Sequence, residues 1–82
     1  MYVVYILECA DGSLYTGITT DMTRRFEEHK VGKGAAYTRS RCVLRIAYQE
    51  EQPDRSAATQ REAAIKKLPR SAKLALIRAV VL

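Results

Sequence analysis

The first 19 residues constrain the fold most, because two strand-like segments are joined there by a short turn signal. Residues 2–9 are rich in β-branched and aromatic side chains and are apolar on both alternating faces. Residues 10–12 read Ala-Asp-Gly, which is typical of a turn, and the strand pattern resumes over residues 13–19. We therefore predict a β-hairpin at this end of the chain.

The length of the hairpin turn decides where two tyrosines point. A two-residue Asp-Gly turn would place Tyr5 and Tyr15 on opposite faces of the hairpin. A three-residue turn, with Gly12 in the left-handed region, would place Tyr5 opposite Gly17 and make the two tyrosines diagonal neighbours on one face. Gly12 suits either turn, so the local pattern leaves both possibilities open.

The remaining segments predict three helices and a third strand. They are a helix over about 21–31 with Thr20 or Asp21 as its N-cap and Gly32 at its end, a basic loop over 32–41, a strand over 42–49, a helix from Asp54 or Ser56 to about Leu68, and a last helix over about 70–80 that carries Leu74, Ile77 and Val81 at helical spacing. The predicted order is ββαβαα. Eighty-two residues allow one folded unit, so a single domain over residues 1–82 is expected.

Basic residues are concentrated in one segment of the chain. Lys and Arg number 14 against 9 acidic residues, a net charge of +5, and no acidic residue lies between Glu28 and Glu50. That interval contains Lys30, Lys33, Arg39, Arg41 and Arg45. Such a surface favours nucleic acid, an anionic membrane surface or an acidic protein as partner, although a solvated basic face is an equally common interpretation.

Cysteine usage and the N-terminal sequence indicate the compartment. Cys9 and Cys42 are far apart without a CxxC spacing, and a single histidine cannot build a multi-ligand metal cluster. We expect two buried free thiols in a reducing environment. The short apolar run ending at Glu8 is neither a signal peptide nor a membrane span, so we expect a cytoplasmic protein without a membrane partner.

Charged groups fall on helix faces that are predicted to be buried. Arg25 and His29 share a stripe at spacing i, i+3, i+4 and i+7 with Met22 and Phe26, and Glu62 lies in a similar stripe of the later helix. A buried guanidinium needs an anionic neighbour. One interpretation is a structural Arg25–Glu62 salt bridge, with His29 as a satisfied core histidine.

The other interpretation is that these groups line one polar pocket with Tyr5 and Tyr15. Arg25 could bind a phosphate oxygen in bidentate fashion, and a lone carboxylate at Glu62 would suit Mg²⁺. A tyrosine that acts as a base needs its pKa lowered by nearby cations, and His29 could accept or relay the proton. This combination predicts metal-assisted hydrolysis of a phosphodiester.

Five segments resemble, in order and at compatible spacing, the motifs of the GIY-YIG nuclease superfamily, in particular its small stand-alone bacterial members. They are VVY at 3–5, YTG at 15–17, TDMTRRFEEH at 20–29, GKGAAYTR at 32–39 and REAAIKKL at 61–68. The resemblance implies an α+β fold, a three-stranded antiparallel sheet flanked by helices in the order ββαβαα. It also implies that both motif tyrosines face the active site, which selects the three-residue turn.

The resemblance further implies an endonuclease that uses one Mg²⁺ or Mn²⁺ ion and leaves a 5′-phosphate and a 3′-hydroxyl. Tyr5 would be the base, Tyr15 would position water or phosphate, Arg25 would stabilise charge on the phosphate, His29 would hydrogen-bond the tyrosine pair, and Glu62 would hold the metal. Residues expected to contact nucleic acid are Gly17, Lys30, Lys33, Tyr37, Arg39 and Arg41.

The sequence departs from the family pattern at three positions, and its 82 residues show no further DNA-binding domain. Both features bear on how specifically the protein is expected to recognise nucleic acid. Val3 stands where the family has glycine, Lys30 where many relatives have Asn, and Pro69 where a capping Ser or Thr is usual. We expect low sequence specificity or a preference for DNA structure, with DNA favoured over RNA and affinity that falls with salt. The alternatives are a non-catalytic nucleic-acid-binding module and a small RNA-associated basic protein.

The apolar end of the chain suggests a possible partner surface. Residues 74–82 read LALIRAVVL. They could form a homodimer contact or bind a protein partner, but packing on the protein's own core is the simpler interpretation.

Overall fold

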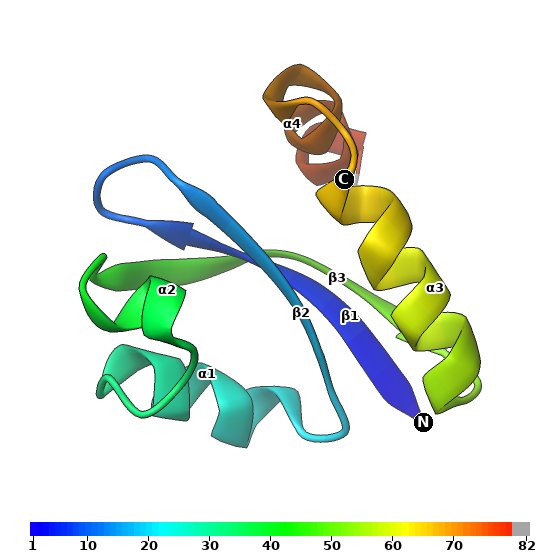
Figure 1. The fold of residues 1–82 in the computed structure, drawn as a ribbon, viewed down its shortest axis with the longest axis horizontal. Helices are drawn as coiled ribbons and strands as arrows, with labels where there is room; N and C mark the ends of the chain where they lie inside the picture. The colour runs from blue at the N-terminus through cyan, green and yellow to red at the C-terminus, as the bar shows by residue number, and fades with distance from the viewer. Residues whose placement is uncertain (80–82) are drawn as a thin grey trace.

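The computed structural model describes residues 1–79 and shows an α+β fold built on one small sheet (Figure 1). The elements are β1 (Tyr2–Cys9), β2 (Leu14–Thr19), α1 (Met22–Lys30), α2 (Ala36–Arg39), β3 (Val43–Gln52), α3 (Arg55–Lys66) and α4 (Arg70–Ala79). The predicted ββαβαα order is confirmed, with α2 as a short helix inside the segment that was predicted to be a loop. The last positions expected for the final helix, including Val81, lie outside the described residues.

The three strands form an antiparallel sheet in the order β2-β1-β3. Helices α1 and α2 lie on one side of this sheet, and α3 and α4 lie on the other (Figure 1). Because β1 is the central strand and both of its faces are covered, its side chains must be apolar on both faces. That requirement explains why the segment shows no alternation of polar and apolar residues.

The hairpin turn contains three residues, as the family resemblance implied. The Gly12 N–H donates to the Cys9 carbonyl at 2.9 Å, and the Cys9 N–H donates to the Ser13 carbonyl at 3.0 Å. Gly12 has φ +84°, a left-handed conformation that is easiest for glycine. The resulting register pairs Tyr5 with Gly17, and it places Tyr15 on the same face.

Two separate apolar clusters fill the two sides of the sheet. On the α3 side, Val4 and Ile6 of β1 are buried against Ala58 and Ile65. The described part of α4 adds to this cluster through Leu76 and Ile77, which pack against the protein's own core. On the α1 side, the buried residues are Tyr5, Leu7, Cys9 and Val43, with Tyr15, Met22, Phe26 and Ile46 packed around them.

Both longer helices begin at aspartate caps. The Asp21 carboxylate accepts a hydrogen bond from the Arg24 N–H at 3.0 Å, and Asp54 accepts from the Ala57 N–H at 2.8 Å. Of the N-cap candidates predicted from the sequence, Asp21 rather than Thr20 caps α1, and Asp54 rather than Ser56 caps α3. Across residues 1–79 no helix is long and apolar enough to cross a membrane.

The third strand and the residue before it differ from expectation. β3 runs to Gln52, and its register against β1 shifts between Ile6 and Leu7, so Ala47 is an extra residue in the ladder. Cys42 precedes β3 with φ 53° and is exposed, whereas Cys9 is buried. The expectation of two buried thiols is therefore wrong for Cys42, because that residue lies in the connection that leads into β3.

Candidate active site

Two tyrosines and the single histidine of the chain meet on the α1 side of the sheet. Tyr5 comes from β1, Tyr15 from β2 and His29 from the last turn of α1. The ring centroids of Tyr5 and Tyr15 are 6.4 Å apart, and the His29 ring lies 5.9 Å from Tyr5 and 5.2 Å from Tyr15. The hairpin register and the helical stripe together bring these three residues into one group.

Buried hydrogen bonds connect this group to α2. The Tyr5 hydroxyl lies 3.0 Å from His29 Nε2, and His29 Nδ1 lies 2.6 Å from the Thr38 hydroxyl. The Thr38 hydroxyl in turn donates to the Ala35 carbonyl at 3.0 Å. Tyr5, His29 and Thr38 are each 1 % exposed. Within residues 1–79 no hydrogen bond joins His29 to Tyr15, so of the two tyrosines only Tyr5 shares a hydrogen bond with His29.

Two glycines leave the space that this arrangement needs. A Cβ at Gly17 would lie 2.5 Å from the Tyr5 hydroxyl oxygen and 3.2 Å from Cε2 of Tyr15. A Cβ at Gly34 would lie 2.7 Å from both Cγ and Cε1 of His29. Any larger residue at either position would have to displace an aromatic ring of the site.

Burial dominates the electrostatics of Tyr5 and His29. Burial raises the pKa of Tyr5 above its usual 10.0, and the nearby Arg25 guanidinium opposes that shift only in part. Burial also lowers the pKa of His29 below 6.5, and Arg25 adds to this effect. Arg25 thus lowers the pKa of Tyr5, as a neighbouring cation should, but in the metal-free protein the loss of water outweighs its charge.

Arg25 has a local partner on its own helix. Its Nη1 atom lies 2.9 Å from Glu28 Oε1, and the two side chains are 30 % and 37 % exposed. Glu28 is therefore the anionic neighbour of Arg25, and both side chains are partly exposed. The structural Arg25–Glu62 salt bridge is not formed, and Arg25 stays accessible from solvent while its charge acts on Tyr5.

Glu62 approaches the site from the helix on the opposite side of the sheet. Ala58 and Ile65 on the same face of α3 are buried, but the Glu62 side chain is 21 % exposed and its Oε2 lies 3.4 Å from Lys66 Nζ. Its charge contributes to the raised pKa of Tyr5. The aromatic group thus comes from the α1 side of the sheet and Glu62 comes from α3, and the two are close enough for the charge of Glu62 to act on Tyr5.

The donor set at Glu62 is compatible with a weakly held Mg²⁺ ion. Within residues 1–79 no group of three His, Cys, Asp or Glu side chains could hold a metal. A single carboxylate oxygen ligand matches the way Mg²⁺ is held when most of its ligands are water and substrate phosphate. Glu62 therefore fits the implied ion, in competition with Lys66.

The residues predicted to contact nucleic acid differ in how exposed and how free to move they are. Lys30, Lys33, Tyr37 and Arg39 are exposed, and the rings of Tyr37 and Tyr15 are 5.6 Å apart. Arg41 is held in place, because its Nη1 lies 2.8 Å from Asp11 Oδ2 and its guanidinium carbon lies 4.2 Å from the centre of the Tyr37 ring. Gly17 is buried against Tyr5.

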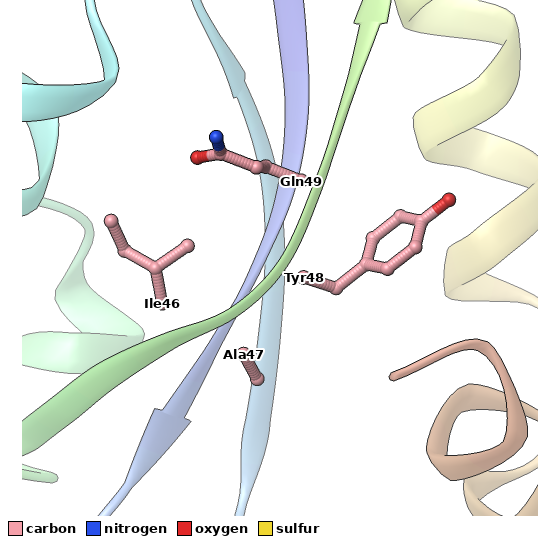
Figure 2. A pocket seen from close by; sticks show the side chains of 4 residues that line it. All are labelled: Ile46, Ala47, Tyr48 and Gln49. Atoms are coloured by element: carbon pink, nitrogen blue, oxygen red, sulfur yellow. The ribbon is translucent and has the colours of Figure 1, made fainter. Parts of the chain in front are cut away.

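A shallow depression of about 290 Å³ lies elsewhere, along the outer strand β3. Its lining residues are Ile46, Ala47, Tyr48 and Gln49. Figure 2 shows Ile46 and Gln49 pointing to one side of β3 and Tyr48 pointing to the other, toward α3. The depression follows the irregular strand edge and contains none of the predicted site residues.

Three residues of the site were missed by the sequence analysis: Thr38, Gly34 and Glu28. Thr38 and Gly34 lie in the segment predicted to be a basic loop, and nothing in that local pattern indicates that they contact His29. The GKGAAYTR segment was noted as a motif, which was the available signal. Glu28 lies three residues after Arg25, a spacing that allows a helical ion pair.

The comparisons with known proteins agree with this fold. Residues 1–75 match the family model of the GIY-YIG catalytic domain. The chain therefore belongs to the GIY-YIG nuclease superfamily, as the five motifs implied.

Within that superfamily the chain is similar over nearly its whole length to UPF0213 proteins. One from Streptococcus sanguinis is 55% identical over 75 residues, which cover 92% of this chain and 86% of that protein. One from Halobacterium salinarum is 47% identical over 76 residues, which cover 93% and 99%. The solution NMR structure of a UPF0213 protein from Bacillus halodurans matches with a TM-score of 0.62 and 44% identity, over 98% of this chain and 86% of that one.

Proposed function

We propose that this protein is a metal-dependent endonuclease that hydrolyses phosphodiester bonds of nucleic acid, with DNA favoured over RNA. The observation that carries the proposal is the buried Tyr5–His29 hydrogen bond beside the partly exposed Arg25. A pair of groups able to transfer a proton, beside a guanidinium suited to phosphate, supports phosphodiester hydrolysis. Membership of a nuclease superfamily supports the same reaction class.

The proposed reaction begins with water attacking phosphorus in line with the leaving oxygen. The attacking water gives its proton to the Tyr5 oxygen while Tyr5 passes its own proton to His29 Nε2, 3.0 Å away. The new bond joins the water oxygen to phosphorus, and the bond from phosphorus to the 3′-oxygen breaks. The leaving 3′-oxygen takes a proton from solvent, so the products carry a 5′-phosphate and a 3′-hydroxyl. Tyr15 would position the water or the phosphate.

Substrate binding would make His29 a better proton acceptor. Burial and, to a smaller extent, the charge of Arg25 lower the pKa of His29 in the free protein. A phosphate bound at Arg25 would neutralise part of that charge, and the pKa of His29 would rise toward its ordinary value. The relay would therefore become most effective when substrate is present.

Glu62 would hold the single Mg²⁺ or Mn²⁺ ion through its carboxylate. Such an ion would supply charge stabilisation at the phosphate as a Lewis acid. Glu62 would have to leave Lys66, whose Nζ lies 3.4 Å away, so substrate phosphate is expected to complete the site.

The surface around the site supports recognition of the nucleic-acid backbone. Lys30, Lys33 and Arg39 are exposed cations close to the site in sequence and fold. Such cations bind phosphate without reading bases, so we expect low sequence specificity or a structural preference, with affinity that falls steeply with salt. The free thiols Cys9 and Cys42 agree with action in the reducing cytoplasm.

The experiment is a cleavage assay on labelled single-stranded, duplex, flapped and branched DNA, with matching RNA, in Mg²⁺ or Mn²⁺. Glu62→Ala and Tyr5→Phe are compared with the matched variants Glu27→Ala and Tyr2→Phe, which change the same residue types outside the site. Cutting should require the metal, be lost in the first pair and persist in the second. Metal-independent binding without cutting on any of these substrates would instead support a non-catalytic binding module.

A further inference from the structure

The hydrogen bonds around Thr38 favour one of the two nitrogens of His29 as the carrier of its proton. The Thr38 hydroxyl has one proton, and the Ala35 carbonyl, which can only accept, lies 3.0 Å away as an acceptor for it. With the proton directed to that carbonyl, the hydroxyl oxygen is free to accept from His29 Nδ1, 2.6 Å away. Nδ1 therefore carries the hydrogen.

A neutral imidazole has one N–H, so Nε2 of His29 is left with a free lone pair. That lone pair faces the Tyr5 hydroxyl at 3.0 Å, and Tyr5 must donate to it. In this arrangement every proton points the same way, from Tyr5 to His29, from His29 to Thr38, and from Thr38 to the Ala35 carbonyl.

We infer that Thr38 is a positioning residue that holds His29 in the Nδ1–H tautomer and so keeps Nε2 free to take the Tyr5 proton. This inference rests on the proposed function for its catalytic consequence, but the tautomer itself is a property of the folded protein. Thr38 is 1 % exposed and does not reach substrate, so its effect passes through His29.

The segment that carries Thr38 is built to fix the imidazole from several sides. Gly34 leaves no Cβ against the ring, Ala35 supplies the carbonyl, and the four-residue helix α2 presents the hydroxyl. The residues on either side of Thr38 are Tyr37 and Arg39, which are exposed. The same short segment therefore orients the histidine on its inner side and presents an aromatic ring and a cation on its outer side.

The test compares Thr38→Val, which keeps the side-chain shape but lacks the hydroxyl, with Thr38→Ser, which retains it. Because His29 is the only histidine in the chain, long-range ¹H–¹⁵N correlation spectra of ¹⁵N-labelled protein report its tautomer without ambiguity. The spectra are recorded at pH 8, where the ring is neutral. Wild type and Thr38→Ser should show the Nδ1–H form, and Thr38→Val should shift toward the Nε2–H form.

Cleavage provides the second readout. In Thr38→Val, kcat should fall about tenfold or more with KM little changed, and Thr38→Ser should recover most of the loss. An Nε2–H tautomer in the wild type would overturn the inference even if Thr38→Val fails to fold. So would equal kcat values for folded Val and Ser variants of an active enzyme. If the wild type shows the Nδ1–H form but cuts no substrate, the proposed function fails while the tautomer assignment stands.

Discussion

Gly17 lies directly across the hairpin from Tyr5, and the tyrosine hydroxyl occupies the space that a Cβ at Gly17 would fill. A Cβ there would lie 2.5 Å from the hydroxyl oxygen and 2.7 Å from the carbon that bears it. The position of Tyr5 in the site thus depends on a residue of the neighbouring strand. This relationship gives a direct test of the site's geometry.

Gly17→Ala should destabilise the protein by about 1–3 kcal/mol, because the added methyl group overpacks a buried ring. Adding Tyr5→Phe to this variant removes the oxygen that is approached most closely, so it should restore part of the lost stability. Urea unfolding of the wild type, both single variants and the double variant measures this coupling. Strictly additive changes would show that the two residues do not constrain one another.

Gly34→Ala should disturb His29, whereas Gly32→Ala in the same loop should not. The first substitution places a Cβ against the imidazole, while the second meets nothing closer than 3.8 Å but strains a backbone with φ +80°. Both should lower stability, the strained position by about 1–2 kcal/mol. Only Gly34→Ala should change the His29 NMR signals and reduce cleavage. Equal effects of the two variants on the His29 signals would argue against the close packing of Gly34 on the imidazole ring.

Acidification should weaken the fold through His29. Burial lowers the pKa of His29 in the folded state, so the unfolded chain, with a pKa near 6.5, binds the proton first. The stability that the neutral ring contributes is full above pH 6.5 and is lost as the pH falls through the folded pKa. Urea unfolding between pH 7.5 and 5 should show this loss. His29→Gln should reduce the dependence of the unfolding free energy on pH. If the pH dependence is unchanged in this variant, other titratable groups are its cause.

Glu28→Gln should bind nucleic acid more tightly than the wild type at little expense in stability. The Arg25–Glu28 pair is about one third exposed on both sides, and such pairs contribute about 0–1 kcal/mol. Removing the carboxylate frees Arg25 for phosphate. Glu27→Gln changes the same charge on the same helix without touching the pair, so the difference in Kd between these variants isolates the effect. Identical affinities would mean that phosphate does not displace Glu28.

Much of the fold followed from local signals in the sequence. The turn glycine, the helical stripes and the aspartate caps are short-range features, and they placed the strands and helices within a few residues. The family resemblance selected the three-residue turn that the local chemistry left open. The approach of Tyr5, Tyr15 and His29 then followed from the sheet register and the helical spacing.

The parts that sequence missed depend on contacts between elements. Glu28 turns toward Arg25 because the guanidinium is only partly buried, and a helical stripe does not reveal that degree of burial. Glu62 comes from α3, which packs on the face of the sheet opposite α1, and the order of elements alone does not specify which face α3 covers. Thr38 reaches His29 only because a four-residue helix forms within the loop.

The three-residue hairpin turn also limits how the chain can change in length. Successive side chains of β2 alternate between the two sides of the sheet, so deleting one residue from the turn would move Tyr15 to the α3 side and Gly17 away from Tyr5. A one-residue deletion at positions 10–12 therefore dismantles the site even though no site residue is touched. In the gene, an in-frame deletion of one codon for this surface turn would therefore damage the site as much as a substitution of one of its central residues.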